Sequence, residues 1–268
     1  MKLLNNLFLV LAGITVFTLT ACGDDDNYSP GEVTNEEGLN VYFEASNNSS
    51  PVLGPTDTEF TLTVSRNKKG SAISVPLEVS KVYADLFTVP SSVDFEADED
   101  TKTITIKVSD KMEMFTSYHL ALSLDPSYTL PYVSNPDAYP NMELNIVKED
   151  YAPYAEGTYI SEGWETNENV TLEYSEILDN YRLKSCWGEG TGNVVFTWDG
   201  TSEVKLVTTS IPTGLIDSDY GAVTVLESDE NPCTYDGATK TFTFPLEWTV
   251  SAGSYGVYND FFTIESMH

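Results

Sequence analysis

Apolar residues recur at every second position through most of this chain, and this period constrains the fold more than any other feature of the sequence. Alternation at period two places the apolar side chains on one face of a strand and therefore predicts half-buried β-strands. The clearest examples in the first half of the chain are the stretches 59–65 (EFTLTVS), 72–80 (AISVPLEVS), 101–109 (TKTITIKVS), 118–124 (YHLALSL) and 142–147 (MELNIV). An antiparallel, immunoglobulin-like sandwich over residues 40–150 is the natural closure of such strands.

The composition changes around residues 148–159 (KEDYAPYAEGTY), and we place the start of a second domain, residues 151–268, in this segment. All four tryptophans follow it, and residues 151–268 hold 19 acidic residues against 4 basic ones. Alternation in the stretch 242–250 (FTFPLEWTV), with turn signals at Asp199-Gly200 and Asp236-Gly237, again indicates antiparallel strands. We expect a meander of about seven or eight strands closed as a small barrel or sandwich.

The chain begins with an almost uncharged apolar run from Leu3 to Ala21, which has the form of a secretion signal. The tetrapeptide Leu19-Thr20-Ala21-Cys22 resembles the lipobox of bacterial lipoproteins. This resemblance implies that residues 1–21 are removed and that Cys22 carries a diacylglyceryl anchor; the alternative is an ordinary signal peptide with a chance cysteine. Residues 22–39 are acidic and contain Pro30, Gly31 and Gly38, so they are predicted to form a flexible tether.

Three aspartates, Asp24, Asp25 and Asp26, follow the cysteine directly. An acidic run at this place resembles the export signal of Bacteroidetes lipoproteins, and the resemblance implies a location on the outer face of the outer membrane. The alternative is that the aspartates only keep the tether solvated.

The chain without residues 1–21 holds 12 basic and 42 acidic residues, a formal charge of −30, and such a surface repels nucleic acid.

The stretch 87–124 resembles Calx-beta and related immunoglobulin-like domains, because an acidic turn precedes a strand that begins with lysine. In this chain the acids that match the calcium ligands of true Calx-beta modules are Asp98, Glu99, Asp100 and Asp110. The next turn departs from the family pattern, since it carries Lys111 and two methionines where acidic residues are usual. We therefore expect a structural spacer without a metal site.

The second domain has a resemblance of its own, carried by the stretches 157–163 (GTYISEG), 181–188 (YRLKSCWG), 194–200 (VVFTWDG) and 254–264 (SYGVYNDFFTI). They resemble the C-terminal domain of Bacteroidetes surface lipoproteins, which are often encoded near glycan-uptake systems. The resemblance implies a glycan-uptake complex of the outer membrane as a partner and brings no catalytic residue.

Few residues of the chain are suited to catalysis. His119 and His268 are the only histidines, and motifs for nucleophilic, zinc-dependent or nucleotide-dependent chemistry are absent, so we predict neither an enzyme nor a cofactor. The many acids form no pair that the sequence can single out for glycoside hydrolysis.

Cys186 and Cys233 either form a disulfide or remain two buried thiols, and their spacing does not decide between these states.

Aromatic residues within glycine-rich and polar segments favour a binding role, because flat rings stack on the apolar faces of sugars. Trp198 and Trp248 alternate with apolar neighbours and are expected in the core. Two hypotheses follow: a surface protein that binds a neutral or cationic glycan, or a structural or adhesive module that contacts another protein. The predicted ligand-binding residues for the first are Trp164, Trp187, Tyr220, Tyr255 and Tyr258.

Overall fold

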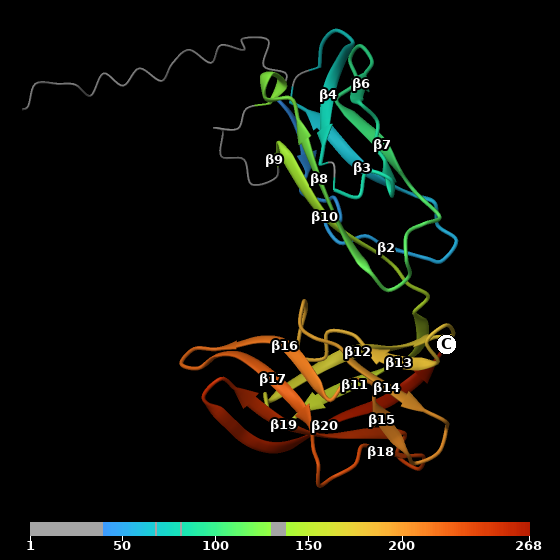
Figure 1. Ribbon diagram of the computed structural model, residues 1–268, viewed down its shortest axis with the longest axis vertical. Helices are drawn as coiled ribbons and strands as arrows, with labels where there is room; N and C mark the ends of the chain where they lie inside the picture. Colours follow the sequence, from blue (N-terminus) through green and yellow to red (C-terminus); the bar gives the residue numbers. More distant parts are fainter. Residues whose placement is uncertain (1–39, 68, 81, 130–137) are drawn as a thin grey trace, which may run out of the picture.

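The computed structural model describes residues 40–67, 69–80, 82–129 and 138–268 (Figure 1). Cys22 and Asp24 to Asp26 lie outside the described residues, as do the predicted signal peptide and the whole of the predicted tether. The predicted all-β fold is confirmed, since the described residues form strands and, apart from these, the 3₁₀ turn η1 (Pro126–Tyr128). No helix among the described residues is long and apolar enough to cross a membrane.

Residues 41–148 form two five-stranded sheets, which we call the N-terminal sandwich. One sheet has the order β5-β7-β3-β1-β9 and the other β2-β10-β8-β4-β6. Neighbouring strands are antiparallel except β2 and β10, which pair in parallel. The strands are β1 (Val41–Glu44), β2 (Val52–Leu53), β3 (Glu59–Arg66), β4 (Ile73–Val79), β5 (Phe87–Thr88), β6 (Ser92–Phe95), β7 (Thr101–Val108), β8 (Ser117–Leu124), β9 (Ala138–Tyr139) and β10 (Asn141–Lys148).

The period of two explains why these strands pack as a sandwich. In β3 and β7 the side chains of Leu62, Val64, Ile104 and Ile106 are buried, while the threonines between them point toward solvent. Both sheets contribute alternate residues to one core, which also contains Phe43, Phe95, Leu120 and Ile146.

Residues 152–267 form one ten-stranded antiparallel sheet, which we call the C-terminal sheet. Its main path is β15-β14-β13-β12-β11-β20-β19-β17-β16, and β18 pairs with β19, so it has more strands than the sequence predicted. The strands are β11 (Ala152–Ser161), β12 (Thr166–Ser175), β13 (Asn180–Leu183), β14 (Val194–Trp198), β15 (Val204–Leu206), β16 (Ser210–Asp217), β17 (Gly221–Glu227), β18 (Thr234–Asp236), β19 (Thr241–Val250) and β20 (Gly253–Met267).

This sheet curls around a second core. The ring of Phe196 in β14 lies 5.1 and 5.2 Å from the rings of Phe242 and Phe244 in β19, although four strands separate β14 from β19 in the sheet order. The curl gives the sheet two ends. The linker end holds the start of β11, and the far end holds the β11–β12, β16–β17 and β19–β20 turns (Figure 1).

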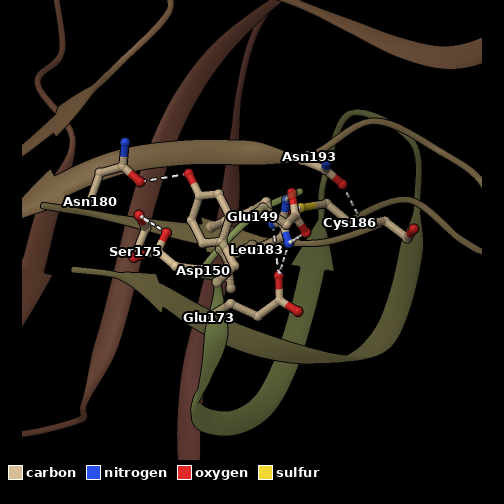
Figure 2. A network of polar contacts seen from close by, with 11 residues as sticks. Glu149, Asp150, Glu173, Ser175, Asn180, Leu183, Cys186 and Asn193 are labelled. Atoms are coloured by element: carbon tan, nitrogen blue, oxygen red, sulfur yellow. Dashed lines mark hydrogen bonds and ion pairs between the residues drawn. The ribbon is translucent and has the colours of Figure 1, made fainter. Parts of the chain in front are cut away.

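The three residues between β10 and β11 bind the C-terminal sheet through a network of polar contacts (Figure 2). The Arg182 guanidinium of β13 donates to both carboxylate oxygens of Glu149, at 2.6 and 2.8 Å, and to Glu173 at 2.7 Å. It also lies 3.8 Å from the ring centroid of Tyr151. Asp150 accepts hydrogen bonds from the Ser175 hydroxyl and from the backbone N–H of Ile177.

Candidate functional site

Three of the predicted ligand-binding residues lie exposed at the far end of the C-terminal sheet. Tyr220 in the β16–β17 turn is 52% exposed, and Tyr255 and Tyr258 of β20 are 41% and 40% exposed. The rings of Tyr220 and Tyr255 lie 6.5 Å apart at an interplanar angle of 65°. We call these three exposed residues, of which Tyr220 and Tyr255 contact each other, the tyrosine cluster.

Asp217 at the end of β16 holds one ring of this cluster in place. Its carboxylate accepts a hydrogen bond from the Tyr255 hydroxyl at 3.0 Å and two more from the backbone N–H groups of Asp219 and Tyr220. These hydrogen bonds hold the pKa of the Asp217 carboxyl below its usual range, and the two from the backbone contribute most. Asp217 therefore stays ionised near neutral pH and joins the β16–β17 turn to the start of β20.

Trp164 lies at the same end, in the turn between β11 and β12, but it is half-buried. Its indole stacks on that of Trp248 with a centroid distance of 6.0 Å and an interplanar angle of 7°. Trp248 pairs in register with Gly256, which stands between Tyr255 and Tyr258 in the sequence. The sheet therefore brings Trp164 toward the tyrosine cluster through the core residue Trp248.

Trp187 is not available to a ligand, and the expectation that it belongs to an aromatic platform is wrong. Its side chain is only 3% exposed, and its indole packs edge-on against Tyr159 and Trp248. The indole N–H donates to the Asp260 carboxylate at 2.9 Å. Gly192 permits this inward position because a Cβ there would lie 2.3 Å from the carbonyl oxygen of Pro212.

Asp260 is a fully buried carboxylate beneath this end of the sheet, and sequence reasoning missed it. It accepts hydrogen bonds from the Tyr159 and Ser161 hydroxyls, both at 2.8 Å, in addition to the Trp187 indole. Burial raises the pKa of the Asp260 carboxyl to about 6 although the three donors act in the opposite direction. The sequence does carry a signal for this position. Asp260 lies two residues before Phe262 in an alternating strand, so both side chains point to the inward face.

Trp248 is fully buried within the second core, where the sequence had placed it, whereas Trp198 is half-buried and packs against that core. Cys186 and Cys233 are separate, free and buried, which resolves the alternative that the sequence left open. Burial raises the pKa of the Cys233 thiol to about 12.

The acidic turn of the N-terminal sandwich contains cationic side chains among its carboxylates. Glu99 accepts from Lys102 at 3.3 Å, and Asp100 pairs with Lys69 at 3.0 Å. Beneath the turn the buried Arg66 guanidinium donates to the carbonyl oxygens of Glu96, Glu99 and Ser71. Within the described parts of the chain, no three His, Cys, Asp or Glu side chains gather as a metal site.

Comparisons with known proteins give distant likenesses. No family model matches the chain, and no curated protein matches it. It is similar to a protein of unknown function from Bacteroides ovatus, with 10% identity, 85% of this chain and 90% of that chain covered, and a TM-score of 0.36. An auxiliary nutrient binding protein from Bacteroides thetaiotaomicron has 12% identity, coverage of 81% and 89%, and a TM-score of 0.34.

The calcium binding domain CBD12 of CALX1.1 has 16% identity, coverage of 80% and 81%, and a TM-score of 0.33. Likenesses at these TM-scores carry no conclusion about the ligand of this chain.

Proposed function

We propose that this chain is a lipid-anchored protein of the outer-membrane surface that binds a neutral glycan without cleaving it. The anchor is Cys22 and the export signal is Asp24 to Asp26, as the resemblances in the sequence imply. The observation that carries the binding function is the tyrosine cluster, in which Asp217 fixes the exposed Tyr255 ring beside Tyr220.

The chemistry of the tyrosine cluster suits a sugar. Exposed rings offer apolar faces to the C–H faces of a pyranose, and a ring held in advance loses little entropy on binding. Neighbouring carboxylates such as Asp219 and Glu162 can accept hydrogen bonds from sugar hydroxyls. Residues 151–268 hold 19 acids and 4 bases, so a sulfated or uronic chain meets repulsion there.

A glycan array probed with the mature chain tests the binding function. We expect neutral glycans among the ligands, and we expect Tyr255→Ala to weaken binding by roughly 1–3 kcal/mol, as for bases that stack on aromatic rings. Tyr255→Phe keeps the ring and removes the bond to Asp217, so it should lose less. Tyr139→Ala, which removes an exposed ring of the N-terminal sandwich, is the matched control. Binding to anionic glycans alone, or equal affinity in Tyr255→Ala, would contradict the proposal.

Location is tested separately from binding. Cys22→Ala should abolish labelling with a fatty-acid probe and release the protein from membranes. External protease on intact cells should degrade the wild type, whereas a variant with Asp24, Asp25 and Asp26 all changed to alanine should be protected inside. Protection of the wild type would show that the export signal is misassigned.

Contact with another protein is the second candidate function, and one apolar residue favours it. Ile216 of β16 is 69% exposed and pairs in register with Ala222, which precedes the buried Val223. It therefore stands on the outward face of an edge strand, where protein partners can add. If this function holds, Ile216→Glu should abolish capture of a cross-linked surface partner in intact cells and leave the glycan array unchanged.

A further inference from the structure

A row of five aromatic side chains lies at the linker end of the C-terminal sheet, opposite the tyrosine cluster. All five are half-buried, and each ring meets the next. The ring centroids of Tyr174 and Tyr154 lie 4.9 and 5.2 Å from that of Tyr181, and Tyr181 lies 5.6 Å from Trp198. Trp198 in turn lies 4.6 Å from Tyr235. We call Tyr154, Tyr174, Tyr181, Trp198 and Tyr235 the aromatic row.

The row continues the inner face of the curled sheet beyond its closed core. Tyr174 pairs in register with Tyr181, and Tyr181 pairs with the fully buried Phe196. Residues that pair across strands share a face, so the row lines the open end of the sheet rather than its outer surface. The open ends of curled and closed β-sheets are common places for small-molecule sites.

Two hollows flank the row, and a single hydrogen bond joins their walls. The first, of about 250 Å³, is lined by Trp198 together with Asp179, Thr197, Asp199, Glu203 and Lys205. The second, of about 340 Å³, is lined by Tyr154 and Tyr174 with Asp150, Ala152, Pro153 and Glu176, and by Pro55 of the N-terminal sandwich. The Tyr174 hydroxyl of the second hollow donates to the Asp179 carboxylate of the first at 2.7 Å.

The Trp198 ring is held in a fixed orientation at the first hollow. Its indole N–H donates to the carbonyl oxygen of Thr201 at 2.7 Å. The Asp199 carboxylate beside it binds both the hydroxyl and the backbone N–H of Thr201. A fixed ring with carboxylates at its edge provides a stacking surface and hydrogen-bond acceptors at once.

The charges around the hollows restrict the ligand. Of the described residues that line them, Lys205 alone is basic, and its ammonium lies 2.6 Å from the Glu203 carboxylate. Asp150, Glu176, Asp179 and Asp199 add four more acidic side chains, so the lining of the two hollows is negative overall. A sulfated or uronic sugar is therefore repelled, while hydroxyl groups find many acceptors.

We propose that the aromatic row is a second carbohydrate site, which takes an oligosaccharide of neutral sugar units laid across both hollows. Single small-ligand pockets have volumes of about 300–1,000 Å³, so each hollow suits a short piece of the chain and the two together suit an extended one. The proposal shares with the proposed function only the ligand class, since the residues of the two sites lie at opposite ends of the sheet.

Titration of the mature chain with neutral malto-, manno- and xylo-oligosaccharides of two to six units tests this site. Affinity should rise with length, because only the longer oligosaccharides reach both hollows. Trp198→Ala and Tyr174→Ala should each weaken binding of the best oligosaccharide roughly 5- to 150-fold, as expected for loss of one stacked ring. Tyr139→Ala, which removes an exposed ring of the N-terminal sandwich outside both proposed sites, is the matched control and should leave this binding unchanged.

The indole N–H resonance of Trp198 gives a second measurement that needs no destabilised variant. Trp198→Phe assigns the resonance, and the oligosaccharide should shift it in the wild type and in Tyr255→Ala alike. The site is disproved if none of the oligosaccharides binds, if the Trp198 resonance does not move, or if tetralysine binds there and the sugars do not. Binding that disappears in Tyr255→Ala and persists in Trp198→Ala would leave the tyrosine cluster as the glycan site and remove this one.

Discussion

Asp260 makes the stability of the C-terminal sheet depend on pH in an unusual direction. The folded protein holds the pKa of this carboxyl near 6, against a reference value of 3.8. As the pH falls from about 6 toward 4, the folded state takes up a proton that the unfolded chain does not, so Asp260 adds stability on acidification. The difference in pKa corresponds to about 3 kcal/mol across this window.

We expect Asp260→Asn to remove this pH dependence without unfolding the protein. An asparagine can accept from Tyr159 and Trp187 with its carbonyl oxygen and donate to the Ser161 hydroxyl with its amide. The variant should be more stable than the wild type at pH 7 and approach it near pH 4, measured as the free energy of unfolding in urea. Asp260→Ala leaves three donors without an acceptor and should destabilise at every pH. An equal difference between Asp260→Asn and wild type at pH 7 and pH 4 would contradict the pKa shift.

Trp187 shows what the sequence could not predict at the scale of one residue. Gly188, Gly190 and Gly192 follow it in the sequence and correctly indicate a loop between β13 and β14. A glycine-rich loop can also approach another strand closely, and here the Gly192 N–H donates to the carbonyl of Thr213 at 2.7 Å. The same glycines therefore turn the indole into the core instead of exposing it.

At the scale of elements, the acidic turn between β6 and β7 is the place where calcium would be expected from the Calx-beta resemblance. Arg66 of β3 holds the carbonyl oxygens of this turn, and its guanidinium lies 5.1 Å from the centroid of the Phe95 ring. Calcium sites need six to eight oxygen ligands, roughly, and a guanidinium among them competes for the same oxygens.

We therefore expect calorimetry to show no calcium binding of micromolar affinity to the mature chain. Arg66→Met, which removes the guanidinium and keeps much of the stem, should destabilise the N-terminal sandwich, because the carbonyl groups of Glu96, Glu99 and Ser71 lose their donor. A micromolar calcium site in the wild type that disappears when Asp98 and Asp100 are changed to asparagine would show that the carboxylates, and not Arg66, decide the chemistry of this turn.

Alternation in the sequence predicted the long strands well and the short ones poorly. β3 and β7 lie almost where the alternating stretches 59–65 and 101–109 placed them. β18 has three residues, too few for a period to appear, and it forms because β19 supplies its partner. β16 was missed because its pairing with β17 shifts register between Pro212 and Ile216.

For the whole molecule, the sequence indicated which face of each strand is buried but not which strands are neighbours. β11 pairs with β20, which sets Ala155 beside Met267, and no periodicity encodes a pairing over such a distance along the chain. The aromatic row was missed for the same reason. Tyr174, Tyr181 and Trp198 each look like ordinary alternating strand residues, and only the order of strands brings them together at one end.

The junction between the two cores also depends on one residue that the sequence did not single out. Phe115 of the N-terminal sandwich packs edge-on against Tyr151 at 6.1 Å, and its N–H donates to the carbonyl of Lys148. Tyr151 lies against Arg182, which also holds Glu149 and Glu173, so contacts continue from one core to the other through this network (Figure 2).

We expect Arg182→Ala to destabilise the C-terminal sheet by about 3–5 kcal/mol, because it leaves two largely buried carboxylates unpaired. All four tryptophans lie in this sheet, so tryptophan fluorescence in urea reports its unfolding directly. The loss should also expose the linker, seen as faster cleavage after Glu149 by a glutamate-specific protease under native conditions. Arg182→Lys keeps the charge without the planar fork and should fall between the wild type and Arg182→Ala.

An exposed ion pair supplies the control for this comparison. Lys205→Ala removes the contact with Glu203 in the same sheet, where both side chains are more than half exposed, and should change stability by no more than about 1 kcal/mol. If Arg182→Ala costs no more than Lys205→Ala and the linker stays resistant to protease, the packing of Tyr151 against Phe115 holds the junction without the ion pairs. The junction would then rest on this aromatic contact and on the hydrogen bonds that Asp150 accepts from Ser175 and Ile177, and Tyr151→Ala would be the substitution that frees the linker.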